Sequence, residues 1–268
     1  MSVQIMNHNL KAAAMWGGGG RAYDVISRSI APAIEHCVTR LDPQPGEQIA
    51  DIATGTGWAS RLLARSGAQV IGVDIADGML SAAREIASEQ GLMIDYQLGD
   101  AEALPFDDGA FDAVVSTFGV MFAPDQSRAT AELARVCKRG ARLAIAAWTP
   151  DSTAVKLRQV LQPFMSPPPS PPPSPFVWGT REWLTGTLGH DFRLASEEGT
   201  VISRFASVEA SWGAYFNGFG PVRAVAAAVS AKRLEEMRQA FMQWMAQFRT
   251  DIGIALPIDY LVTVGQRL

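Results

Sequence analysis

The chain is poor in the residues that build disulfide frameworks, zinc sites and catalytic triads. Of its 268 residues, 2 are cysteines and 3 are histidines. Cys37 and Cys137 lack metal-like spacing and fall in segments that we expect to be helical, so we predict two buried, reduced thiols. His8, His36 and His190 are too scattered along the chain to indicate a zinc site or a triad. We therefore expect no metal.

Long apolar segments and basic clusters are also missing. No stretch approaches the roughly 18 apolar residues of a membrane-spanning helix, and the first residues, MSVQIMNHNLK, lack the basic and apolar regions of a secretion signal. The net charge is −4, and no run of Lys or Arg supplies the basic surface that duplex nucleic acid requires. We expect a cytoplasmic protein that binds neither membrane nor nucleic acid, and a substrate that is not highly anionic.

Short apolar segments alternate with helical ones through the first half of the chain. The predicted strands are 49–53, 70–73, 94–98, 111–117 and 142–147. The predicted helices are 21–41, 57–66, 77–90 and 125–138. Strands that alternate with helices of this length predict βαβ units and a parallel, doubly wound α/β sheet.

This alternation ends after Trp148. Residues 166–175, SPPPSPPPSP, favour extended polyproline II and are interpreted as a semi-rigid connector, with a Pro-rich ligand for a partner domain as the alternative. Residues 180–188 are predicted to be helical and 191–205 extended, whereas 207–249 are predicted to be helical with an interruption at Pro221. The alternating residues 259–265 predict a last strand at the edge of the sheet.

The strongest motif is a glycine-bearing turn between the first strand and the helix after it. In DIATGTG (51–57), Gly55 and Gly57 let the backbone approach a ligand where a Cβ would clash. The backbone N–H groups at the start of the helix can bind a polar or anionic group. Taken alone, this turn would also fit a degenerate dinucleotide-binding fingerprint.

Three acidic residues at three successive strand ends narrow the choice of ligand. Asp51 precedes the glycine turn, where a carboxylate can hold the ammonium of an amino acid. Asp74 ends the second strand, a position from which a carboxylate accepts hydrogen bonds from both ribose hydroxyls. Asp100 follows the third strand and is placed to meet an adenine amino group. Together they describe an adenosine that carries an amino acid.

Residues 47–148 resemble the class I S-adenosylmethionine-dependent methyltransferases, in particular the small-molecule enzymes of the ubiquinone-biosynthesis type. The resemblance implies a seven-stranded, doubly wound, mostly parallel sheet with an antiparallel last strand, and S-adenosylmethionine as the cofactor. The matching motifs are DIATGTG (51–57), VIGVDIADGML (70–80), LGDAEALPFDDGAFDAVVS (98–116) and ELARVCKRGARLAIAAW (132–148).

The resemblance also implies the cofactor contacts. Asp51, Thr54, Gly55 and Gly57 would surround the methionine part, and Ala53 stands where the family usually has its first glycine. A positive φ at Ala53 would count against the assignment. Further implied residues are Asp74 for the ribose, Ile75, Met79, Asp100, Ala101 and Glu102 around the adenine, Ser116 for the ammonium through its carbonyl, Arg21 for the carboxylate and Tyr23 as a closing side chain.

No catalytic residue is assigned, because methyl transfer from a sulfonium needs mainly in-line orientation and exclusion of water. His190, Tyr215 and Glu182 are candidate bases. The acceptor walls are expected from 117–122, the N-terminal helix and the aromatic-rich 149–256, which favours a small apolar or aromatic substrate methylated at O, N or C. A non-catalytic cofactor binder acting through a partner stays open as an alternative, and Asp51 and Asp100 argue against a nicotinamide-dependent oxidoreductase.

We expect one methyltransferase domain over 1–268. It comprises an N-terminal helical cap (1–45), a cofactor-binding core (46–150) and a substrate-side region (151–268). Within that last region we place the Pro-rich linker at 166–175, a helical insertion forming a lid at 207–256 and the last strand at 258–267.

Overall fold

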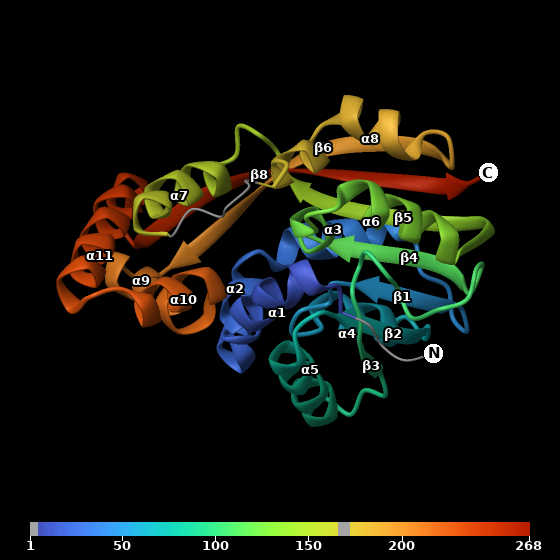
Figure 1. Ribbon diagram of the computed structural model, residues 1–268, viewed down its shortest axis with the longest axis horizontal. Coiled ribbons are helices and arrows are strands. Elements are labelled where there is room, and N and C mark those ends of the chain that lie inside the picture. The colour runs from blue at the N-terminus through green and yellow to red at the C-terminus, as the bar shows by residue number, and fades with distance from the viewer. Residues whose placement is uncertain (1–4, 166–171) are drawn as a thin grey trace.

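The computed structural model describes residues 5–165 and 172–268 and contains one central sheet (Figure 1). The pairs β1–β2, β2–β3, β1–β4 and β4–β5 are parallel, and β8 is antiparallel to both of its neighbours. The predicted doubly wound, mostly parallel α/β sheet is confirmed. Its strands, in spatial order, are β3 (Asp95–Leu98), β2 (Gln69–Asp74), β1 (Gln48–Ile52), β4 (Phe111–Thr117), β5 (Cys137–Trp148), β8 (Gly253–Arg267) and β6 (Phe192–Phe205), with the short β7 (Arg249–Thr250) paired to β8.

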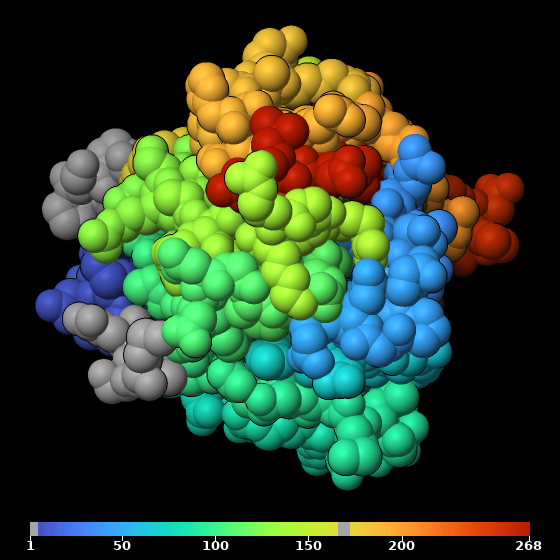
Figure 2. All heavy atoms as spheres, turned by 90° about the vertical axis from the view of Figure 1, so that its right-hand side faces the viewer, coloured from blue at the N-terminus to red at the C-terminus, as the bar shows by residue number. Residues whose placement is uncertain are grey.

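The prediction that the last strand forms the sheet edge is wrong, because β8 lies between β5 and β6. Figure 2 shows the C-terminal residues of β8, in red, between the amber β6–α8 region and yellow-green residues of the β5 region. The sequences of β8 and β6 suit an internal strand and an edge strand, respectively. Residues 260–263 of β8 are buried in succession, as in an internal strand. The middle of β6, SEEGT (196–200), is polar and partly exposed, as an edge strand should be.

Helices cover both faces of the sheet. α3 (Ala31–Leu41) lies behind it in Figure 1 and packs against α4 (Trp58–Arg65), while α6 (Gln126–Val136) lies in front and contacts α8 (Arg181–Leu188). α5 (Asp77–Glu89) joins β2 to β3. Right-handed crossovers that run outward from β1 in both directions place their helices on opposite faces.

Two local predictions need correction. The helix expected at 21–41 is divided into η2 (Gly20–Tyr23), α2 (Asp24–Ser29) and α3. Ile30, between α2 and α3, does not have helical backbone angles. Pro32 lies in the first turn of α3, where a missing N–H breaks no helical hydrogen bond. Cys137 starts β5 instead of lying in a helix, although both cysteines are buried and unpaired as predicted.

A second group of helices lies beyond the carboxyl ends of the parallel strands, at the left of Figure 1. α9 (Val208–Gly218), α10 (Gly220–Ala228) and α11 (Ala231–Met245) are inserted between β6 and β8, and α7 (Thr153–Leu161) follows β5 and packs on α11. The N-terminal α1 (Leu10–Gly17) falls in the expected helical cap (1–45), for which only the helix 21–41 was given a range. It lies between this group and the sheet (Figure 1). The remaining short helices are Asn7–Asn9, Val120–Phe122, Gln162–Phe164, Pro175–Gly179 and Ala246–Phe248.

The Pro-rich segment is described only in part. Residues 166–171 lie outside the described residues, so the connector predicted at 166–175 can be followed only from Pro172. Pro175 starts the short helix 175–179, and the preceding Ser174 caps it. Among the described helices, none has the length and apolarity to cross a membrane.

Candidate cofactor and acceptor site

A cavity of about 1030 Å³ opens at the carboxyl ends of β1, β2, β3 and β4. This edge is where parallel α/β sheets bind their ligands. We call it the first cavity. The predicted site residues that line it are Tyr23, Ala53, Thr54, Gly55, Asp74, Ile75, Met79, Asp100 and Ala101.

The turn after β1 is built from three residues with positive φ. Gly55 and Gly57 have φ of 57° and 79°, and Ala53 has φ of 58°. Ala53 thus has the positive φ that was expected to count against the assignment, yet it lines the first cavity together with Thr54 and Gly55. A left-handed alanine costs about 1–2 kcal/mol, which the surrounding sheet can absorb. The strain lies beside the ligand cavity, where strained backbone is often found in functional sites.

Asp51 lies beneath this turn and is fully buried. Its Oδ2 accepts hydrogen bonds from Thr54 Oγ1 (2.6 Å), Ser60 N (3.0 Å) and Ser60 Oγ (2.7 Å). Its Oδ1 has no hydrogen-bond partner among the described residues. Burial raises the pKa of this carboxyl, and the hydrogen bonds from Ser60 and Thr54 oppose the rise. Asp51 does not line the cavity directly, so a ligand would meet it through the turn that it supports or through water.

Asp74 ends β2 on the wall of the first cavity. Its Oδ2 accepts a hydrogen bond from Gly55 N at 2.8 Å, and its Oδ1 accepts one from Ala76 N at 2.9 Å. Each carboxylate oxygen keeps a further lone pair for a ligand. Burial raises the pKa of Asp74 to about 6, against the lowering effect of these backbone bonds.

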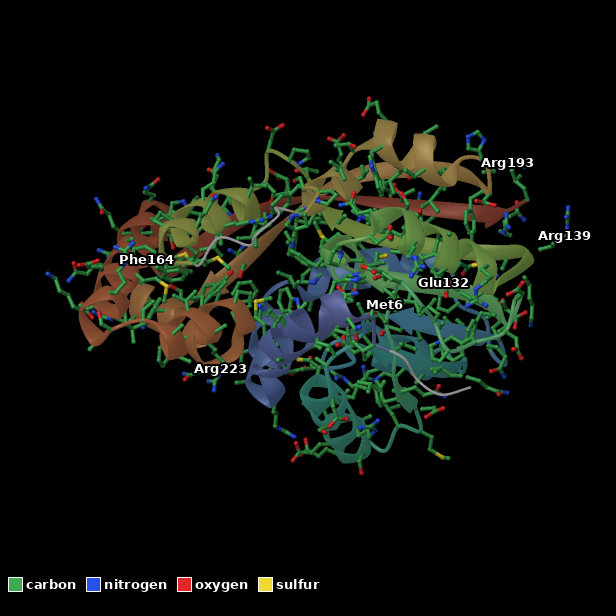
Figure 3. The ribbon with its side chains drawn as sticks, in the orientation of Figure 1. Met6, Glu132, Arg139, Phe164, Arg193 and Arg223 are labelled. Carbon is green, nitrogen blue, oxygen red and sulfur yellow. The ribbon has the colours of Figure 1, made fainter. Side chains whose placement is uncertain are left out.

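Asp100 connects the cavity to the N-terminal segment. Its Oδ2 accepts hydrogen bonds from Met6 N (3.0 Å) and Asn9 Nδ2 (2.9 Å), and its Oδ1 accepts one from Glu102 N (3.0 Å). The segment that contains Met6 thus passes the side of the cavity formed by Asp100 (Figure 3). Asn9 itself lines the cavity and has a buried Oδ1 without a partner among the described residues.

Some predicted residues lie behind the cavity wall. Glu102 is buried, with its two oxygens bonded to His8 Nε2 (2.6 Å) and Asp125 N (2.8 Å). The Ser116 hydroxyl donates to Ile52 O and accepts from Val120 N, so it joins the ends of β1 and β4.

Gly57 and Arg21 also have structural roles that the sequence reading did not foresee. A Cβ on Gly57 would overlap the Tyr96 ring, so this glycine makes room for a core side chain. Arg21 forms surface ion pairs with Glu85 (3.1 Å) and Glu89 (2.7 Å) on α5 and does not line the cavity.

The N-terminal helix α1 and the turn after β4 supply further lining residues. The sequence predicted an N-terminal helix and this turn as walls of the acceptor site but did not single out the residues. Ala12 and Trp16 of α1 line the first cavity, and so does Phe118, which has φ of 59°. A Cβ on Gly119 would overlap the Cβ of Ala53, so the two turns pack in direct contact. The pattern LKAAAMWG (10–17) is a signal that could have revealed α1.

A second cavity, of about 1350 Å³, adjoins the first on the side of the inserted helices. Its lining is mostly apolar and includes Met121, Leu157 and Phe219. Phe118 and Trp148 stack there with ring centroids 3.7 Å apart and an interplanar angle of 15°. The residues common to the two cavities are Trp16, Tyr23, Ile30, Phe118, Phe122, Ala123 and Pro124.

Few ionisable side chains reach either cavity. The charged residues in the described lining are Asp74 and Asp100 in the first cavity and Arg158 at the second. Of the three candidate bases, Tyr215 lines the second cavity, whereas Glu182 and His190 are exposed and line neither. No group of metal-binding side chains is found among the described residues.

In the described lining of the two cavities, Arg158 is the one basic side chain. In Figure 3, Arg139 and Arg193 point outward at the end of the sheet opposite the inserted helices, and Arg223 lies on the outer side of α10.

Comparison with known sequences places the chain among methyltransferases. Residues 50–145 match the model of a family described as a methyltransferase domain. An uncharacterized protein of Mycobacterium tuberculosis is 31% identical over 258 residues, which cover 95% of this chain and 93% of that protein. The demethylmenaquinone methyltransferase of Thermobifida fusca is 40% identical over 141 residues, which cover 50% of this chain and 59% of that enzyme.

Solved structures share the fold. The YcgJ protein of Bacillus subtilis superposes with a TM-score of 0.61 at 17% identity, over 88% of this chain and 98% of that one. A phosphoethanolamine N-methyltransferase of Haemonchus contortus, solved with S-adenosylhomocysteine, has a TM-score of 0.54 at 18% identity, over 87% of this chain and 52% of that one. The chain belongs to the class I S-adenosylmethionine-dependent methyltransferases.

Proposed function

We propose that the chain transfers a methyl group from S-adenosylmethionine, bound in the first cavity, to a small apolar or aromatic acceptor in the second. The observation that carries this proposal is the junction between the two cavities, where seven lining residues are shared. A methyl donor and its acceptor must meet across such a junction for an in-line displacement.

The residues of the first cavity fit the cofactor. Asp74 offers free lone pairs to a ribose diol, and Ile75, Met79 and Ala101 provide apolar surface for an adenine ring. The Asp51 oxygen without a partner is a buried negative site close to the glycine turn, where an amino-acid ammonium can be neutralised. Thr54 and Gly55 would hold the methionine part. When bound, S-adenosylmethionine supplies an electrophilic methyl group.

The chain's own contribution to the chemistry is orientation and exclusion of water. No His, Lys, Cys or Glu side chain is present in the described lining of the two cavities. The stacked Phe118 and Trp148 rings give the second cavity a flat apolar wall, which favours an aromatic acceptor because stacked rings add to the energy of burial. The T. fusca relative is named as a demethylmenaquinone methyltransferase, and a quinone acceptor is consistent with that choice.

The three regions of the chain would divide this work. The cofactor-binding core at 46–150 holds the methyl donor, and the cap at 1–45 closes the first cavity through Asn9, Trp16 and Tyr23. The substrate-side region at 151–268 forms most of the outer wall of the second cavity and acts as its lid.

Isothermal titration tests the cofactor part of the proposal. Both S-adenosylmethionine and its demethylated product S-adenosylhomocysteine should bind one site per chain, and nicotinamide dinucleotides should not bind. Absence of binding of either ligand at millimolar concentration would overturn the proposal. Incubation with S-adenosylmethionine and a panel of apolar aromatic acceptors, read out as S-adenosylhomocysteine release, tests the acceptor part.

A further inference from the structure

Two tyrosines lie at the junction of the two cavities or beside it. Tyr23 lines both cavities and contributes the one hydroxyl among their seven shared residues. Tyr215, on α9, lines the second cavity. The N-terminal segment and α9 approach closely here, because a Cβ on Gly218 would come within 2.5 Å of Ala22 O and 3.2 Å of Tyr23 Cα. The backbone contact thus brings the two tyrosine-bearing elements side by side.

Tyr215 is held rigidly but its hydroxyl is left without a protein partner. The residue is 6% exposed, and its ring packs against Phe205, Phe219 and Phe241 with centroids 5.2–6.1 Å apart. Neither its hydroxyl nor that of Tyr23 has a hydrogen-bond partner among the described residues. Both tyrosines line cavity space, so a bound ligand can accept a hydrogen bond from their hydroxyls.

Both phenols stay protonated at neutral pH and act as donors. Burial, and then the charge of Asp74, raises the pKa of Tyr23 to about 12. Burial and the neighbouring Tyr23 raise the pKa of Tyr215 as well. The other charged groups that line the cavities are Asp100 and Arg158. Asp74 lies in the first cavity, and no carboxylate or histidine is present in the described lining of the second, so two donors there can stabilise an oxyanion but cannot remove a proton from a weakly acidic acceptor.

We propose that Tyr215 and Tyr23 bind the oxygen of the methyl acceptor, and that the acceptor is an apolar phenol or enol that reacts as its anion. This inference rests on the function proposed above and specifies its substrate class. The acceptor hydroxyl loses its proton to water, and the two phenols hydrogen-bond to the resulting oxyanion. The anion, through its oxygen or the conjugated carbon, forms the new bond to the methyl carbon, while the sulfur–methyl bond breaks and its electron pair stays on sulfur.

A chromophoric phenol tests the proposal without turnover. The protein is saturated with S-adenosylhomocysteine, whose binding is first measured for every variant, and 7-hydroxycoumarin is titrated in by absorbance and fluorescence. We expect a lower pKa for the bound coumarin than for the free one, and tighter binding of its anion than of 7-methoxycoumarin. In Tyr215→Phe the anion should bind about 10- to 100-fold more weakly, as loss of one hydrogen bond to a charged group implies, with unchanged binding of 7-methoxycoumarin. Tyr23→Phe should act in the same direction.

Tyr96→Phe is the matched control. Tyr96 is a buried tyrosine that lines neither cavity, so this variant should bind the coumarin anion within about twofold of the wild type. The proposal is overturned if the wild-type protein shows no preference for the coumarin anion, or if Tyr215→Phe binds the anion as tightly as the wild type does. It is also overturned if Tyr215→Phe loses affinity for 7-hydroxycoumarin and 7-methoxycoumarin to the same extent. If the wild-type protein does not bind S-adenosylhomocysteine, the proposed function itself is contradicted. This outcome is distinguishable because S-adenosylhomocysteine binding is measured before any coumarin is added.

Discussion

Replacement of Asp74 by asparagine should weaken cofactor binding strongly, and it also removes one of the two backbone hydrogen bonds to this side chain, because an amide nitrogen cannot accept. The carboxylate already accepts hydrogen bonds from Gly55 N and Ala76 N, and its remaining lone pairs are free for the two ribose hydroxyls. A hydrogen bond to a charged group contributes about 1.5–3 kcal/mol, and one between neutral groups about 0.5–1.5 kcal/mol. Loss of the charge at two bonds therefore removes about 2–3 kcal/mol, which is a 30- to 150-fold rise in Kd, to order of magnitude.

The pH dependence of the affinity for S-adenosylhomocysteine, compared between the wild type and Asp74→Asn, gives a second, independent test. Because burial raises the pKa of Asp74 to about 6, much of the carboxyl is protonated at pH 5. Ribose hydroxyls bind the ionised form better, so wild-type affinity for S-adenosylhomocysteine should fall by about tenfold from pH 7.5 to pH 5. Asp74→Asn should show no such fall.

The folded-state pKa of Asp74 lies above its ordinary value of 3.8, so the folded state binds more protons between pH 3.8 and about 6. The contribution of Asp74 to stability is thus present below pH 3.8 and is lost as the pH rises through 6. The wild-type free energy of unfolding should decline across this window relative to that of Asp74→Asn.

Calorimetric titration of S-adenosylhomocysteine into both proteins measures these effects, with circular dichroism as the check on folding. Asp77→Asn is the control, because this neighbouring carboxylate has a side chain that is 77% exposed and lies outside the cavity. Its Kd should match that of the wild type. Equal affinity of folded Asp74→Asn and wild type at pH 7.5 would refute the ribose assignment.

Three further predictions concern the turns and the N-terminal segment. Ala53→Gly should raise the free energy of unfolding by up to about 1 kcal/mol in urea, because relief of left-handed strain exceeds the entropy cost of glycine; a lower stability would contradict this. Gly119→Ala should lower it by about 1–3 kcal/mol, since the new Cβ overlaps Ala53 and lies 2.8 Å from its oxygen, and adding Ala53→Gly should restore part of the loss; full stability of the single variant would rule the contact out. Asn9→Ala removes the 2.9 Å bond to Asp100 and should speed amide exchange in residues 7–17, as seen by mass spectrometry; unchanged exchange would show that this bond does not hold the segment.

Most residues that line the first cavity at the strand ends were predictable from the sequence, because their determinants are local. Strand ends marked by Asp51, Asp74 and Asp100 converge at one edge of any parallel sheet, so three separate motifs could be combined before the structure was known. Whether the last strand, β8, lies at the edge of the sheet or inside it was harder to predict. The alternation of β8 suits both places, and the position was decided by pairing with β5 and β6, which are distant in sequence.

The acceptor side was not predictable because its determinants are tertiary. Phe118 and Trp148 are 30 residues apart in the sequence, and their stacking follows from the tertiary structure alone. Tyr215 was singled out as a possible base, but its burial makes it a donor. The positive φ of Ala53 also had no local signal, since alanine ordinarily avoids that conformation and the surrounding turn imposes it.

The most direct test of the proposed function is a crystal structure of the chain with S-adenosylhomocysteine. We expect the ribose hydroxyls on Asp74, the adenine beside Ile75 and Ala101, and the sulfur directed toward the junction at Tyr23. A ligand bound in the second cavity, or bound in the first with its ribose away from Asp74, would contradict the proposed site.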